Sequence, residues 1–158
     1  MLTTVNDYLP LLLRIALVVL FPFSALDKIV NWPAAMRQAG TVFLPRTMLV
    51  LSICVELLTP VCIVSGWHDR AAAFVLAGFC VITALLFHQF WRFADFWRFQ
   101  EGAGLEHFWE FLKNFGLVGG LGFVMLGAVP LPLSEVLQHP LASSAVIGSD
   151  SAIDRTRR

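Results

Sequence analysis

A carboxylate in the middle of an apolar stretch is the residue of this sequence with the clearest chemical consequence. Glu56 lies about halfway along the stretch from Met48 to Val64, which is long enough to cross a bilayer. An ionised carboxylate in hydrocarbon costs roughly 3 kcal/mol or more, so such a side chain faces a partner or a cavity. Arg14 and Lys113 lie inside two other apolar segments and are the candidate partners.

The expected depths of these charges predict a buried cluster. Arg14 and Lys113 each lie about five residues inside their segments, from opposite faces, which places each about 6–8 Å in depth from Glu56 at about 1.5 Å per residue. Lys28 and Asn114 are further candidate hydrogen-bond donors to this cluster. Two cations around one anion would suit an anion, a quinone carbonyl or a lipid headgroup oxygen. A buried ion network that only sets the helix register is the alternative interpretation.

The composition indicates a membrane protein. The 158 residues are 58% hydrophobic and only 14% charged, and the mean hydropathy is +0.75. A soluble domain is about half apolar and about a quarter charged, and one small core cannot bury the surplus. The formal net charge of zero gives no indication of a nucleic-acid partner. We therefore expect the lipid bilayer to be the main surroundings of the chain.

The apolar segments predict an all-α fold, a four-helix transmembrane bundle with antiparallel neighbours. Helices are expected because backbone amides in lipid must pair within their own segment, and each segment is close to the ~20 residues that a span requires. The expected spans are 9–26, 46–65, 70–90 and 108–129. A short interfacial helix is expected after the first span. Residues 1–132 would form the transmembrane domain, and residues 133–158 a polar, largely flexible tail.

Glycines in the last span predict close helix packing. Gly116 and Gly120 form a GxxxG pattern, and Gly119 lies beside them. Small residues at this spacing let two helices approach closely in a membrane, either within the bundle or against a second subunit.

The sequence offers no redox or metal centre of its own. His88 and His107 are expected near the same membrane face, but a haem or metal needs side chains that converge on one point, so we expect no metal. The three cysteines form no CxxC pair, which disfavours a thiol-oxidising enzyme. Phosphate-binding loops, nucleophile elbows and zinc-protease motifs are also absent from the sequence.

Several of these segments together resemble the DoxX family of small bacterial membrane proteins. FSALDKIVNW at 23–32 resembles the family's Ser-Gly-x-x-Lys stretch, with Ala25 where the family usually has glycine. FLKNFGLVGGLGF at 111–123 resembles the family's Phe-x-Lys-Asn-x-x-x-x-Gly-Gly signature and is the most specific match. Arg14 and Glu56, followed by LLTPVCIVSGW, are also similar, and the resemblance covers about residues 9–128.

The resemblance implies a multi-pass protein of the bacterial cytoplasmic (inner) membrane. The family includes subunits of thiosulfate:quinone oxidoreductase and members associated with membrane redox complexes. Our leading hypothesis is therefore an accessory, quinone-facing subunit, catalytic only as part of a quinone-linked oxidoreductase, with other subunits or a second copy as partners. Arg14, Glu56 and Lys113 would form the pocket, with Lys28 and Asn114 donating hydrogen bonds to a non-covalently held quinone. A transporter or binder of a small anion or lipid, and a purely structural assembly subunit, remain open alternatives.

Overall fold

The structure is a computed structural model that describes residues 2–40, 43–94 and 102–127. Every regular element in these ranges is a helix, so the all-α prediction is confirmed for the described residues. The elements are α1 (Leu2–Val18), α2 (Leu20–Val30), α3 (Trp32–Ala39), α4 (Pro45–Ser65), α5 (Asp69–Phe87), the short 3-10 helix η1 (Phe90–Arg92) and α6 (Ala103–Leu126). The predicted tail, 133–158, lies outside the described residues.

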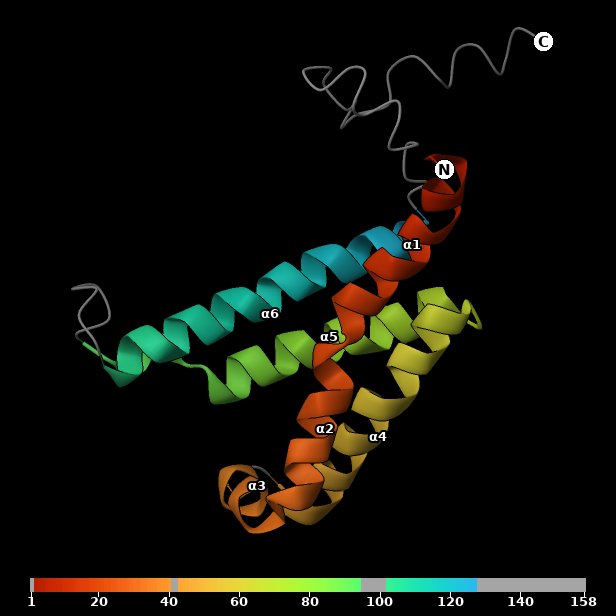
Figure 1. Cartoon of the computed structure of the whole chain (residues 1–158). Helices are drawn as coiled ribbons and strands as arrows, with labels where there is room; N and C mark the ends of the chain where they lie inside the picture. The colour runs from red at the N-terminus through yellow and green to blue at the C-terminus, as the bar shows by residue number, and fades with distance from the viewer. Residues whose placement is uncertain (1, 41–42, 95–101, 128–158) are drawn as a thin grey trace, which may run out of the picture.

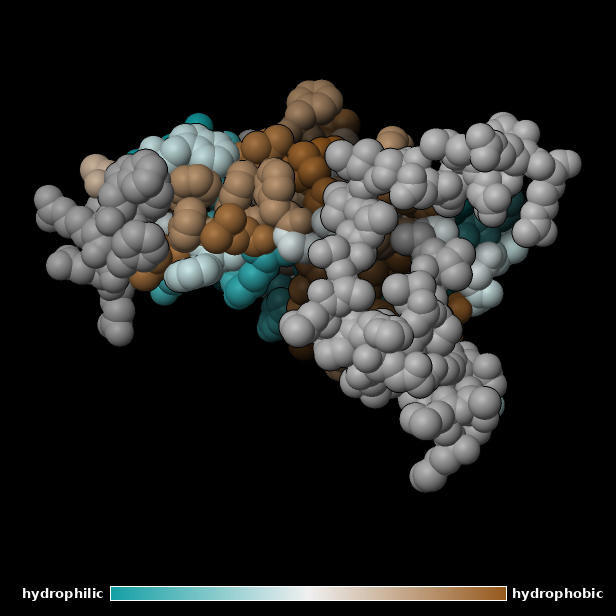
Figure 2. Space-filling view, turned by 90° about the horizontal axis from the view of Figure 1, so that it is seen from above, coloured by the Kyte–Doolittle hydropathy of each residue, from teal (hydrophilic) through white to brown (hydrophobic). Residues whose placement is uncertain are grey.

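Three segments of the described chain are long and apolar enough to cross a membrane: Tyr8–Val30, Pro45–Ser65 and Asp69–Arg92. They overlap the expected spans 9–26, 46–65 and 70–90. Large apolar side chains on these helices are exposed. Figure 2 shows brown, apolar residues over part of the described surface that is seen from above. Such a surface is stable against lipid and costly against water. The helix α6, with 24 residues, is also long, but it carries charges in its first half and is not one of these three segments.

The first span is broken in its middle by a proline. Pro22 has no N–H to donate to the carbonyl of Val18, and its ring crowds that carbonyl. The helix accordingly ends at Val18 and begins again at Leu20, and the chain changes direction there (Figure 1). The second piece, α2, runs on to Val30, beyond the end expected at residue 26. Lys28 therefore stands on a helix and not in a loop.

The helix α5 is the centre of the fold. Its residues Ala73, Leu76, Cys80 and Ala84 are fully buried and follow the 3-4-4 spacing of a single helix face. Small side chains on that face allow neighbouring helices to come close. The core cluster around them also includes Ile63 of α4 and residues of α2 and α6.

A tight turn places α4 beside α5. Gly66 adopts φ +77°, a left-handed conformation that favours glycine, and His68 precedes α5 with φ +49°. Figure 1 shows α5 lying along α6, while α1 and α2 lie with α4 at an angle to that pair. The pairing of α2 with α4 brings the polar residues of the two helices together.

Candidate functional site

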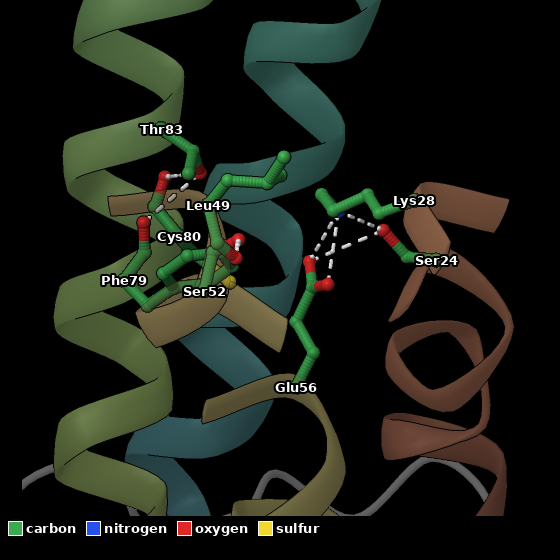
Figure 3. A network of polar contacts seen from close by, with 8 residues as sticks. All are labelled: Ser24, Lys28, Leu49, Ser52, Glu56, Phe79, Cys80 and Thr83. Atoms are coloured by element: carbon green, nitrogen blue, oxygen red, sulfur yellow. Dashed lines mark hydrogen bonds and ion pairs between the residues drawn. The ribbon is translucent and has the colours of Figure 1, made fainter. Parts of the chain in front are cut away.

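Glu56 is buried in the middle of α4, with only 3% of the residue exposed. Pro60, one turn later in the same helix, has no N–H to donate to the backbone carbonyl of Glu56. The side chain leaves α4 towards α2 (Figure 3). The expectation of a buried carboxylate at this position agrees with the structure.

The partners of Glu56 are Lys28 and Ser24, both on α2. The Lys28 ammonium donates to the two carboxylate oxygens at 2.8 and 2.9 Å and to the Ser24 hydroxyl oxygen at 2.6 Å. The Ser24 hydroxyl donates to Glu56 Oε1 at 3.1 Å (Figure 3). Ser24 and Lys28 share one face of α2 because they are four residues apart. We call these three residues the Glu56 triad.

The hydrogen bonds of the triad leave spare acceptors and no spare ammonium donor. Lys28 has three N–H groups, and all three are used within the triad. Glu56 Oε1 accepts from both Lys28 and Ser24, whereas Oε2 accepts only from Lys28. A carboxylate oxygen has two lone pairs, so Oε2 can accept one more hydrogen bond. In this geometry the triad is suited to a hydroxyl group that donates to Oε2.

Arg14 pairs with a different carboxylate from the one expected. Its guanidinium lies 2.8 Å from Asp69 Oδ2 and donates to the backbone carbonyl of Ile63 at 2.9 Å. The predicted pairing with Glu56 is wrong because Arg14 lies ten residues before Ser24, about 15 Å along a helix. In the antiparallel pairing of the first span with α4, that distance brings Arg14 level with the C-terminal end of α4. There Arg14 links α1 to the end of α4 and to the start of α5.

Lys113 also has its own carboxylate, one turn away on α6. Its ammonium lies 2.6 Å from Glu110 Oε1, and its side chain is 66% exposed. The Asn114 amide donates to the Glu110 backbone carbonyl at 2.9 Å. The predicted contact of Lys113 with Glu56 is therefore wrong, since Lys28 fills that position from α2. Both α6 residues nevertheless line the same cavity as the triad.

That cavity has a volume of about 790 Å³ and is lined by residues of α2, α3, α4, α5 and α6. Most of its wall is apolar. Ser52 and Thr83 also line it, but their hydroxyls donate to carbonyls of their own helices (Figure 3). The triad forms one polar part of the wall. A second polar part comprises His88, Glu110, Lys113 and Asn114.

The charges of the cavity differ from the expected cationic cluster. Its described lining holds two lysines, Lys28 and Lys113, and three carboxylates, Asp27, Glu56 and Glu110. Each lysine already pairs with a carboxylate. The prediction of a net positive centre is therefore wrong, because each cation has a separate acidic partner.

The three glycines singled out in α6 have different surroundings. A Cβ atom on Gly120 would lie 2.6 Å from Leu17 Cδ1 of α1, so this glycine permits a close helix contact. Gly116 and Gly119 have open space where a Cβ atom would be. Within the described chain, the close-packing role thus belongs to Gly120 alone of these three.

Sequence reasoning missed Ser24 and Asp69 as partners in the two ion pairs that they join. The spacing of Ser24 and Lys28 on one helical face was the available signal for the first. Asp69 is the first residue of α5, and no spacing in the sequence linked it to Arg14. His88 directly follows the last residue of α5 and lines the cavity, with its ring 5.8 Å from that of His107. The described residues contain no group of three or more side chains arranged to hold a metal ion.

Comparison with known proteins gave one family and one curated relative of note. The family model described as DoxX matches residues 9–89. The inner membrane protein YqjF of Escherichia coli (strain K12) is 30% identical over 110 residues, which cover 70% of this chain and 76% of that protein. No solved structure matches the chain. The family match includes the whole Glu56 triad but ends before 111–123, the segment whose resemblance was the most specific.

Proposed function

The chain belongs to the DoxX family and is a multi-pass protein of the bacterial inner membrane, and from this premise we propose that it holds the headgroup of a quinone in the cavity beside the Glu56 triad. It does so as an accessory subunit, and a partner protein carries the redox cofactor. Protein partners, the quinone and the redox role are all part of this proposal.

One observation carries the proposal: a buried ion pair forms part of the wall of a largely apolar cavity. A quinone headgroup is a neutral ring with polar oxygens and an apolar tail. It needs apolar walls, a few polar contacts and access from lipid. The volume, about 790 Å³, lies in the range of roughly 300–1,000 Å³ typical of small-molecule sites. The exposed apolar helix faces allow a lipid-soluble ligand to approach from the membrane.

The charge of the cavity supports a neutral ligand over an anion. With three carboxylates and two lysines in its described lining, the cavity repels a negative charge if all five groups are ionised. Both lysines are engaged with carboxylates, so neither is available to an anion without breaking an ion pair. We therefore favour the quinone-binding subunit over the anion transporter as the function of this protein.

The triad can also serve the proton chemistry of a quinone. Each quinol hydroxyl that becomes a carbonyl releases one proton and one electron. Glu56 Oε2 has the acceptor capacity to receive a hydroxyl hydrogen bond, and its carboxylate is the nearby group able to take the proton. The electrons pass to the cofactor of the partner protein. The Lys28 ammonium can also donate to a carbonyl oxygen of the quinone. To do so it gives up its 2.6 Å hydrogen bond to the Ser24 hydroxyl oxygen.

In this proposal α6 crosses the membrane as the fourth span, and α3 lies at the membrane interface. The proline at the start of α3 and its mixed composition are compatible with a surface position. With α6 in the membrane, its ion pair Lys113–Glu110 belongs to the wall of the cavity. A bundle of four spans then surrounds the Glu56 triad and the cavity beside it.

The test is the quinone content of the protein purified in mild detergent. Mass spectrometry of the extracted lipids should find quinone with the natural protein, and Glu56→Gln should reduce it about tenfold, since a charged hydrogen bond is worth about 1.5–3 kcal/mol. Glu106→Gln is the matched control, because Glu106 is an exposed carboxylate of α6 that does not line the cavity.

The same preparation separates the alternatives. Quinone content unchanged in Glu56→Gln, or absent from the natural protein, would contradict the proposal. A variant that loses thermal stability but keeps its quinone would favour the structural assembly subunit. Proteins that co-purify identify the partner.

A further inference from the structure

His88 occupies a fixed position at the end of α5. Its backbone N–H donates to the Ala84 carbonyl at 3.1 Å, and its carbonyl accepts from the Phe90 N–H at 2.9 Å. The main chain is thus held on both sides of the residue. The side chain lines the cavity that also contains the Glu56 triad.

The ring of His88 has a buried nitrogen without a partner. Nδ1 is buried and makes no hydrogen bond with the described residues. A buried polar atom left unpaired costs about 1–3 kcal/mol, so native proteins rarely keep one without a reason. Because His88 lines a ligand-sized cavity, a turn of its ring that brings Nδ1 to the cavity surface would satisfy this atom with a hydrogen bond to a ligand.

Neighbouring groups do not supply this hydrogen bond. The ring of His107 lies 5.8 Å from that of His88, centre to centre, and is stacked on Phe93 at 5.2 Å. Glu110 also lines the cavity, but its carboxylate is paired with Lys113. His88 is therefore the described residue of this wall with a free buried hydrogen-bonding atom.

We propose that His88 Nδ1 binds the second oxygen of the quinone headgroup while the Glu56 triad binds the first. The inference rests on the proposed function and sharpens its ligand class: a ring that carries two hydrogen-bonding oxygens, one for each polar part of the wall. The two contacts come from different elements, the triad from α2 and α4 and His88 from the end of α5.

Histidine suits both oxidation states of such a ligand. A neutral imidazole carries its proton on one nitrogen and leaves the other as an acceptor. With the proton on Nδ1, the ring donates to a quinone carbonyl. With the proton on Nε2, Nδ1 accepts from a quinol hydroxyl. Once the ring has turned Nδ1 towards the cavity, His88 can therefore bind either form by a change of tautomer alone.

The experiment pairs a change in the protein with a change in the ligand. A hydroquinone with a short alkyl tail is compared with the matching alkylphenol, which lacks one of the two hydroxyl groups. Dissociation constants are measured anaerobically in detergent by titration calorimetry. The natural protein should bind the hydroquinone about tenfold more tightly than the phenol, the effect of one hydrogen bond. His88→Phe should bind both compounds with equal affinity.

Two milder variants keep the test decisive if His88→Phe does not fold. His88→Asn keeps a polar atom near the position of Nδ1, and His88→Gln keeps one near Nε2 only. The hydroquinone preference should persist in His88→Asn and disappear in His88→Gln. Size-exclusion profiles and thermal unfolding show which variants are folded.

Each outcome has a distinct meaning. A tenfold preference that His88→Phe retains would overturn the role of His88 and leave the proposed function in place. Failure of the natural protein to bind either compound would overturn the proposed function, and the inference with it.

Discussion

At the scale of single residues, the structure resolves the problem of a carboxylate in a membrane by neutralising it locally. Lys28 pairs with Glu56, Arg14 with Asp69 and Lys113 with Glu110. These pairs differ in surroundings, since the Glu56 side chain is 4% exposed and that of Lys113 is 66% exposed. Removing one partner of a buried pair leaves the other charge without compensation. When the pair is exposed, water solvates the charge that remains.

Lys28→Met should therefore lower the free energy of unfolding by about 3 kcal/mol, because Glu56 is left buried and unpaired. The double variant Lys28→Met/Glu56→Leu should recover much of this loss. Thermal unfolding in detergent measures both.

Lys113→Met is the matched control, as it removes the same charge from an exposed pair and should cost at most about 1 kcal/mol. If both variants lose the same free energy of unfolding, the burial of the Lys28–Glu56 pair adds nothing to its contribution to stability.

At the scale of helices, prolines and small residues decide which side chains meet. Pro22 breaks the first span, so that α2 runs along α4 in its own direction and presents Ser24 and Lys28 to Glu56. The alanines of α5 let the neighbouring helices approach its buried face. Gly120 allows Leu17 of α1 to lie against α6.

Gly120→Val should destabilise the protein by about 1–3 kcal/mol, because the added side chain overlaps Leu17. The measurement is again thermal unfolding in detergent.

Gly116→Val makes the same chemical change on the same helix, at a position with open space. It should leave stability nearly unchanged. If both variants lose stability alike, the α1–α6 contact is not close in the folded protein.

At the scale of the whole molecule, the helices enclose a cavity with polar groups from several of them. Residues that line it belong to α2 through α6. The proposed function requires that α6 crosses the membrane beside α5, against which it packs (Figure 1).

The crossing of α6 can be tested by labelling single cysteines with a membrane-impermeant maleimide, after the natural cysteines 54, 62 and 80 are replaced. Trp67→Cys reports the α4–α5 turn, and Ser144→Cys reports the chain after α6. Both should label from the same side of the membrane, and Ala94→Cys, at an exposed position after η1, from the other. Labelling of Ser144→Cys from the side of Ala94→Cys would show that α6 does not cross.

The sequence by itself determined that this chain is helical, that it belongs in a membrane and that Glu56 needs a partner. These properties follow from length, composition and the cost of burying a charge, and they do not depend on how the helices pack. It also named Lys28 as a donor to the buried cluster, although not as the partner of Glu56.

Only the tertiary structure decided which cation meets Glu56. The depth of a residue along a span does not give the direction in which its side chain points around the helix axis, because successive residues of a helix point about 100° apart. The break at Pro22 and the antiparallel register then moved Arg14 to Asp69 and brought Lys28 to Glu56. The unpaired Nδ1 of His88 depends in the same way on how α5 and α6 pack, because no local pattern in the sequence shows whether a buried nitrogen finds a partner.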